Sequence, residues 1–235
     1  MGFCTPFCQA TRYILFSCAA SDRKGSGYKH VQMNGTAHDR RVVTKAENFI
    51  EKYCTHVRGS RTGEPLILAP WQHEIVTSLF GSVRANGDRQ YKLVWIEAPR
   101  KSGKTTLAAA LMLYMLLVDE EAGAEISSSS TTNASICFNI ARSMIENNAD
   151  MSAVCTVRNK CISYKNNHIR LAALTAAASG GLDLSMAVID DVQNVIQRDL
   201  HETLKSAVAA RRNPIIFPDY ASFSACQSVV QMRNI

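Results

Sequence analysis

The stretch Ala98-Pro99-Arg100-Lys101-Ser102-Gly103-Lys104-Thr105-Thr106 decides the fold of this chain. Before it, residues 91–97 are rich in β-branched and aromatic side chains, and after it an apolar segment runs from Thr105 to Val118. Strand, glycine-containing loop and helix are the context in which a phosphate-binding loop works. The backbone N–H groups of such a loop and the amino end of its helix bind anionic oxygens. The sequence therefore predicts a phosphate site of the Walker A type.

Two side chains of this loop suit a nucleotide and its metal. Lys104 supplies a positive charge for the β- and γ-phosphates, and the hydroxyl of Thr105 is a ligand for Mg²⁺. Ala98 stands where the pattern usually has its first glycine. The predicted nucleotide-binding residues of the loop are Arg100, Lys101, Ser102, Gly103, Lys104, Thr105 and Thr106.

A second motif follows about 85 residues later, where the apolar run 186–189 ends in Asp190 and Asp191. A buried strand of this kind carries its acids to the edge of the sheet beside the phosphate loop. Asp190 would hold Mg²⁺ together with Thr105, and Asp191 would orient the water that attacks the γ-phosphate. The alternative interpretation is a strand that ends in a solvated acidic turn.

Two further segments are weaker candidates. Gln72 can form paired hydrogen bonds with an adenine edge, although a surface glutamine beside a core Trp71 is an equally ordinary interpretation. The hydroxyl-rich run 127–132 follows an expected strand, and strand carboxyl ends face the ligand in a parallel sheet. A simple helix N-cap explains that run equally well.

The charge of this 235-residue chain is unevenly distributed. Residues 12–61 hold ten Lys and Arg and four Asp and Glu, an excess of six that equals the net charge of +6. A polyanionic partner such as DNA and an ordinary solvated face are both consistent with this segment. The eight cysteines are scattered without a CxxC pair, which indicates reduced thiols in a cytosol. We expect no membrane span, because no apolar run reaches about 18 residues.

Expected strands and helices alternate from residue 42 onward. Helices are expected over 42–57, from Pro70, over 105–118, over 133–147 and over 200–211, and strands over 91–97, 124–129, 154–157, 161–164, 169–171, 184–189 and from Pro214. This alternation predicts an α/β fold with a mostly parallel sheet and helices on both faces. Residues 1–39 look irregular.

The order of these pieces resembles the large subunit of tailed-bacteriophage terminases, the ATP-driven motors that package DNA into procapsids. The resemblance covers roughly residues 42 to 217. It rests on the following segments in this order: Leu68-Ala69-Pro70-Trp71-Gln72, Arg100-Lys101-Ser102-Gly103-Lys104-Thr105, Glu120-Glu121-Ala122-Gly123-Ala124-Glu125, Val188-Ile189-Asp190-Asp191 and Ala210-Arg211-Arg212-Asn213-Pro214.

The resemblance implies an additional-strand, helicase-like P-loop NTPase fold for an ATPase domain over 40–217. It further implies ATP and Mg²⁺ as cofactors, with Gln72 facing the adenine, Asp190 serving the metal and Asp191 in the position of the catalytic glutamate. The implied partners are double-stranded DNA, a small terminase subunit, a portal protein and further copies in a ring. The implied location is the cytoplasm of a bacterial host.

The sequence departs from the family pattern in three ways. Asp191 replaces a glutamate, so we expect ATP binding with slow turnover, since a misplacement of about 1 Å can cost about 10²-fold in rate. We expect no nuclease domain in this chain. The segment 218–235 is expected to be a divergent tail, because Pro218 lacks the N–H that a central strand uses.

A frameshift or premature stop that leaves a truncated ATPase domain would explain this tail. Two other hypotheses stay open at this point. One is a non-catalytic nucleotide- or DNA-binding module, in which Asp190 and Asp191 are structural and the basic N-terminal segment is active. The other is an inert fragment with an exposed sheet edge.

Overall fold

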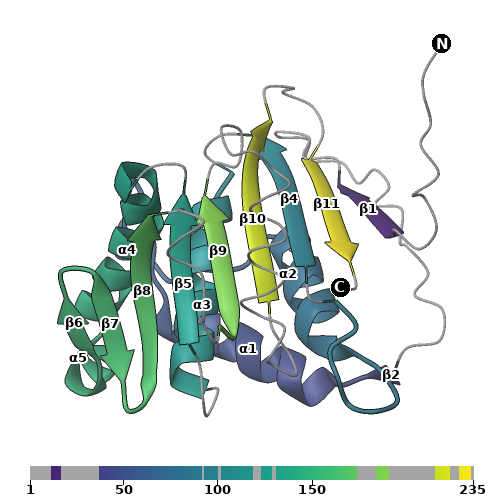
Figure 1. Cartoon of the computed structure of the whole chain (residues 1–235), viewed down its shortest axis with the longest axis horizontal. Coiled ribbons are helices and arrows are strands. Elements are labelled where there is room, and N and C mark those ends of the chain that lie inside the picture. Colours follow the sequence, from purple (N-terminus) through teal and green to yellow (C-terminus); the bar gives the residue numbers. More distant parts are fainter. Residues whose placement is uncertain are drawn as a thin grey trace.

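The computed structural model describes residues 12–16, 37–91, 93–99, 102–118, 123–128, 131–173, 184–190, 215–222 and 228–233. Its main feature is a sheet of nine strands in the order β1-β11-β4-β10-β9-β5-β8-β7-β6 (Figure 1). These strands are β1 (Arg12–Phe16), β4 (Leu93–Pro99), β5 (Gly123–Ser128), β6 (Thr156–Arg158), β7 (Cys161–Tyr164), β8 (Asn167–Ala173), β9 (Met186–Asp190), β10 (Ile215–Ser222) and β11 (Ser228–Arg233). The short strands β2 (Ala37–His38) and β3 (Ser82–Val83) form a separate pair.

The centre of the large sheet is parallel. Strands β4, β10, β9, β5 and β8 run in one direction, and antiparallel strands extend the sheet at both ends. The strand β10 lies between β4, which leads into the phosphate loop, and β9, which ends at Asp190. An inserted strand at this position is the additional strand that the family resemblance implies, so the expected fold class is confirmed.

The described helices lie behind the sheet in the view of Figure 1. They are α1 (Arg40–Tyr53), α2 (Pro70–Val76), the π-helical turn η1 (Thr77–Gly81), α3 (Lys104–Val118), α4 (Thr131–Glu146) and α5 (Ala149–Val154). The expected helix 200–211, a candidate for covering the other face, lies outside the described residues.

The helix α3 forms the centre of the core. Every residue from Leu107 to Leu116 is buried, because α3 is apolar on all sides and packs between the sheet and the helices α1 and α4. Tyr114 of α3 makes edge-on ring contacts with Phe49 of α1 and Phe80 of η1. These contacts join the helical layer to the helix that follows the phosphate loop.

Local sequence signals account for the helix ends. Asp39 caps α1, because its Oδ1 accepts a hydrogen bond of 3.0 Å from the backbone N–H of Arg41. Asn148 caps α5 in the same way through Met151. Pro70 opens α2 at a position where its missing N–H has no helical partner.

Several expectations about the fold were wrong. The N-terminal segment expected to be irregular contains β1 and β2, and α5 was not expected at all. Strand β10 continues through Pro218 to Ser222, although a proline was not expected within a central strand. Strand β11 lies within 218–235, and the divergence of this segment from the family pattern stays a prediction.

The position of Pro218 explains how a proline fits in a central strand. On one side, residues 215–218 of β10 all pair with β9. On the other side, β10 pairs with β4 only at Ile216 and from Asp219 to Ser222. Among the described pairs, Phe217 and Pro218 therefore have no partner on β4. The pairs with β9, and the pairs with β4 before and after these two residues, keep β10 in the sheet.

The described cysteines are Cys54, Cys137, Cys155 and Cys161, and all four are free thiols. No helix in the described segments is long and apolar enough to cross a membrane.

Candidate nucleotide site

The phosphate loop connects the end of β4 to the start of α3. Gly103 has a φ of +94°, which L side chains rarely adopt, and its carbonyl accepts a hydrogen bond of 2.9 Å from the N–H of Leu107. The helix thus begins directly after Gly103, and its first backbone N–H groups face the loop. The expected strand, loop and helix are present, while Arg100 and Lys101 lie outside the described residues.

Lys104 is the first residue of α3 and is only 6% exposed. Thr105 and Thr106, which follow it, are half-buried. The backbone carbonyl of Thr105 lies 3.8 Å from the thiol of Cys137 on α4. The first turn of α3 is therefore packed in the core, and this packing fixes the backbone positions of Lys104 and Thr105.

Gln72 lies against this loop. It is buried on α2, and its Oε1 accepts a hydrogen bond of 2.9 Å from the N–H of Ala69. A Cβ placed on Gly103 would lie 3.4 Å from the Nε2 of Gln72. The structure thus brings together two predicted site residues that are far apart in sequence, and Gln72 presents its amide nitrogen to the loop. Its neighbour Trp71 is half-buried and packs against the core, as expected.

The loop also contains an unpartnered polar atom. The Oγ of Ser102 is buried and has no hydrogen-bond partner among the described residues. A buried hydroxyl without a partner is unfavourable unless a ligand completes it. Together with the left-handed Gly103 and the amino end of α3, this hydroxyl fits a bound phosphate.

The acidic edge of the sheet is described in part. Strand β9 ends at Asp190, and Ser128, the last residue of β5, is in register with Asp190. Because β4 and β9 are both parallel to β10, Asp190 lies toward the carboxyl ends of these strands, level with Ile96 of β4 and about 10 Å across the sheet from it. Asp191 lies outside the described residues. Among the residues that the structure describes, no group of three or more His, Cys, Asp or Glu side chains is arranged so that it could hold a metal ion.

A cluster of three polar side chains that sequence reasoning missed joins α2 to α1. The Nδ1 of His73 lies 2.8 Å from Glu47 Oε1, and its Nε2 lies 3.7 Å from Glu51 Oε1. The same oxygen of Glu51 is 3.5 Å from the N–H of Leu68. His73 follows Gln72 directly, so the cluster fixes the segment that carries Gln72. The signal in the sequence was the pair of glutamates four residues apart, one helical turn of α1.

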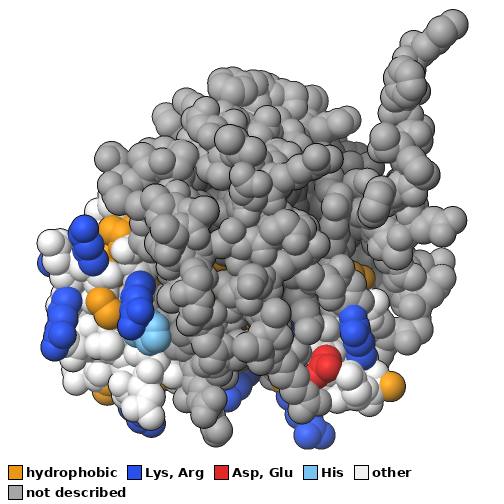
Figure 2. All heavy atoms as spheres, in the orientation of Figure 1, with side chains coloured by type: hydrophobic (Ala, Val, Ile, Leu, Met, Phe, Trp, Pro, Cys, Tyr) orange, Lys and Arg blue, Asp and Glu red, His pale blue; other side chains and the backbone are white. Residues whose placement is uncertain are grey.

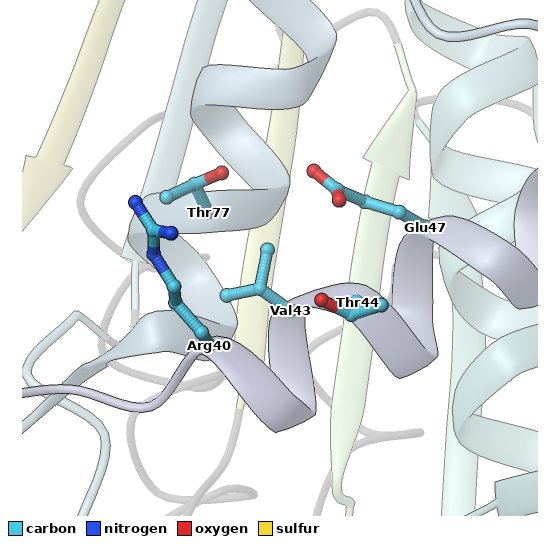
Figure 3. A pocket seen from close by; sticks show the side chains of 5 residues that line it. All are labelled: Arg40, Val43, Thr44, Glu47 and Thr77. Atoms are coloured by element: carbon cyan, nitrogen blue, oxygen red, sulfur yellow. The ribbon is translucent and has the colours of Figure 1, made fainter.

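A pocket of about 410 Å³ lies beside this cluster, between α1 and the start of η1. Figure 3 shows the side chains of Arg40 and Thr77 on one side, Glu47 on the other, and Val43 between them. Thr44 completes the lining. None of these residues was a sequence candidate, and none belongs to the phosphate loop.

The fold and the loop together define a P-loop NTPase with an additional central strand. Residues 70–218 match the family described as "Terminase large subunit, ATPase domain". Because this match covers more than half of the 235 residues, the chain belongs to that family, and the resemblance noted in the sequence is confirmed.

Two relatives come from the bacteriophage HK97. The sequence of the terminase large subunit of Enterobacteria phage HK97 is 26% identical over 178 residues, which are 72% of this chain and 34% of that protein. The crystal structure of the HK97 large terminase has the same fold, with a TM-score of 0.62 at 21% identity over 76% of this chain and 37% of that chain. The chain thus spans about a third of the length of the relative it matches.

Proposed function

We propose that this chain is the ATPase domain of a DNA-packaging motor, and that it binds and hydrolyses ATP with Mg²⁺ at the loop between β4 and α3. The observation that carries the proposal is the contact between Gln72 and Gly103, at the start of a helix whose first residue is the buried Lys104. A nucleotide site needs its base-binding and phosphate-binding groups on one continuous surface, and this contact provides such a surface.

Each residue has a role in this proposal. Lys104, Ser102 and the N–H groups at the start of α3 bind the phosphates, with Arg100, Lys101 and Thr106 beside them. Gln72 donates from Nε2 to an acceptor on the adenine edge, since its Oε1 already accepts from Ala69. Thr105 and Asp190 would hold Mg²⁺, which neutralises charge on the phosphate oxygens when bound. Asp191 orients the attacking water.

Because Asp191 is one methylene shorter than the usual glutamate, the proposal includes slow turnover. Replacing it, Asp191→Glu, is expected to raise the hydrolysis rate up to about 100-fold, since a misplacement of about 1 Å costs that much. An unchanged rate would contradict the role given to Asp191.

The first test is nucleotide binding by isothermal titration. Lys104→Ala is expected to weaken ATP binding about 10- to 100-fold, the equivalent of a charged hydrogen bond. The control is Lys45→Ala, which removes an exposed lysine of α1. Gln72→Ala is expected to reduce the preference for ATP over GTP. Equal affinities of wild type and Lys104→Ala would overturn the proposed site, and binding without phosphate release would favour a non-catalytic nucleotide-binding module.

The partners of the motor follow from the proposed function. They are double-stranded DNA, a small terminase subunit, a portal protein and other copies of the chain in a ring, in the cytoplasm of a bacterial host. Arg142, one candidate for an arginine acting on a neighbouring copy, is paired with Glu146 at 2.7 Å in this chain. The other candidates, Arg211 and Arg212, lie outside the described residues.

A further inference from the structure

The antiparallel strands β6, β7 and β8 form an end of the large sheet that is unusually basic. Residues 156–173 contain four Lys and Arg, no Asp and no Glu. The four cations are Arg158, Lys160, Lys165 and Arg170, and all four are exposed. A segment of this length without a single acid is not accounted for by the nucleotide site.

The strand register places both arginines on one face. Arg158 is paired with Cys161 of β7, which is paired in turn with Arg170 of β8, so the three residues form one cross-strand row. His168, two residues before Arg170, lies on the same face. The alternate residues Ile162 and Ile169 are fully buried on the opposite face, toward the helices. We call the face with Arg158, Cys161, His168 and Arg170 the outer face.

The outer face is open to solvent and positively charged. Figure 2 shows Lys and Arg side chains gathered over β6, β7 and β8, with no Asp or Glu among the coloured side chains there. Arg158, Lys160 and Arg170 form no ion pair with a described carboxylate. On the neighbouring strand, Glu125 of β5 is the register partner of Arg170.

We propose that the outer face of β6–β8 binds the phosphate backbone of double-stranded DNA. Arg158 and Arg170 are separated by one strand, so their backbones are about 10 Å apart. Each DNA strand carries a phosphate about every 3.4 Å along the axis, so two long side chains at this separation reach different phosphates. Arginine forms paired hydrogen bonds with phosphate oxygens, and the exposed Lys160 adds a further charge at the β6–β7 turn.

The choice of DNA rests on the proposed function, because a basic face alone fits any polyanion. Apart from the half-buried His168, the described side chains on this face carry no aromatic ring that could stack on unpaired bases. The face therefore suits contacts with the backbone of a duplex that are independent of base sequence.

The test compares two double variants with the same loss of charge. Arg158→Ala/Arg170→Ala removes two cations from the outer face, and the control Arg41→Ala/Lys45→Ala removes two exposed cations from α1. Binding of a labelled 30-base-pair duplex is measured by fluorescence anisotropy at several salt concentrations. For the outer-face variant, the slope of log affinity against log salt is expected to become less negative by about 1.8, or about 0.9 for each lost phosphate contact. The control should keep the wild-type slope.

A second readout locates the contact. Cys161 lies between the two arginines, so duplex DNA should slow its alkylation by iodoacetamide, measured by peptide mass spectrometry. Cys155, outside the face and also half-buried, is the internal control.

The proposal would be overturned if the wild type did not bind the duplex or if DNA did not protect Cys161. It would also be overturned if both variants had the same slope of log affinity against log salt, or if only the α1 variant changed that slope. Titration of the same variants with ATP separates the two inferences. Intact ATP binding with no DNA contact at this face would refute only the DNA contact, and lost ATP binding with an intact DNA contact would refute only the proposed function.

Discussion

The amide nitrogen of Gln72 lies 3.4 Å from the position that a Cβ on Gly103 would occupy, although the two residues are 31 positions apart in the chain. The contact joins α2 to the turn that opens α3. The same glutamine accepts a hydrogen bond from Ala69, so its amide group has a fixed orientation. A change in the position of either residue is therefore expected to affect the other.

A change of Gly103→Ala is expected to destabilise the chain by about 1–2 kcal/mol, because an alanine at a φ of +94° clashes with its own backbone. The added Cβ would make only an ordinary contact of 3.4 Å with Gln72, so the backbone conformation is the main cause. Urea denaturation measures the change in the free energy of unfolding.

The double variant Gly103→Ala/Gln72→Ala separates these causes. If the backbone is responsible, removing the Gln72 side chain leaves the loss caused by Gly103→Ala unchanged. Recovery of stability in the double variant would show that crowding against Gln72 is the cause instead.

A second prediction concerns the cluster of His73, Glu47 and Glu51. His73→Ala is expected to weaken ATP binding a few-fold, since a hydrogen bond contributes about 0.5–1.5 kcal/mol and the bond between His73 and Glu47 positions Gln72. If His73 acts through Gln72, His73→Ala has no further effect on ATP affinity in a Gln72→Ala background. Isothermal titration of the four proteins of this cycle measures the coupling.

The matched control for His73 is Arg61→Ala, which breaks an exposed ion pair elsewhere, that of Arg61 and Glu64 at 2.6 Å. It should leave ATP affinity unchanged. Additive effects of His73→Ala and Gln72→Ala would mean that His73 supports the fold in general and does not position Gln72.

The sequence alone predicted those helices and strands whose local composition favours one structure. The apolar helix α3 and the strand β4 were predicted because their composition leaves few alternatives, and the additional strand β10 followed from the family resemblance. The extension of β10 through Pro218 was not predicted, because a proline that removes one donor is tolerated when strands on both sides hold the rest of the ladder.

The site could be predicted only in part, because some of its contacts join elements that are far apart in the sequence. The contact of Gln72 with Gly103 and the cluster at His73 depend on how α1 and α2 pack, which no local pattern contains. The basic outer face was missed for a different reason. Residues 12–61 hold six more Lys and Arg than Asp and Glu, which equals the net charge of the whole chain, so the rest of the sequence has no net charge. This average hides the basic segment 156–173, because other segments are acidic.

A third prediction concerns Asn167, which is buried and donates a hydrogen bond of 2.9 Å from Nδ2 to the carbonyl of Leu116. This carbonyl belongs to the last turn of α3, where helical partners are missing. Asn167→Ala is expected to cost about 1–3 kcal/mol in the free energy of unfolding, because the buried acceptor loses its donor. The exposed neighbour Asn166→Ala is the control. A difference between the two variants within about 0.5 kcal/mol would contradict this role.

A fourth prediction concerns the thiol of Cys54. Burial raises its pKa from 9.0 to about 12. At pH 8 the thiolate fraction is therefore about 1,000-fold smaller than at the ordinary pKa, and reaction with iodoacetamide should be correspondingly slow. Mass spectrometry of the alkylated chain should find Cys161 modified long before Cys54, and all cysteines modified in urea. Equal rates for Cys54 and Cys161 in the folded chain would contradict the buried position.

The last prediction concerns the stability of the chain in mild acid. Burial and the nearby Arg170 lower the pKa of His168 below its ordinary 6.5, while a hydrogen bond that the imidazole donates to the backbone of Asn166 acts in the other direction. Burial and Arg61 also lower the pKa of His56, opposed by Glu64. Both histidines therefore bind a proton more readily in the unfolded chain than in the folded one.

Because the unfolded chain takes up more protons, the contribution of these two histidines to stability is complete above pH 6.5 and is lost as the pH falls below it, toward the lower pKa values of the folded chain. NMR titration of the imidazole signals should give both pKa values below 6.5. Arg170→Gln should raise the pKa of His168 and leave that of His56 unchanged, and Arg61→Gln should do the reverse. An unchanged pKa of His168 in Arg170→Gln would show that Arg170 does not act on it from the same face of β8.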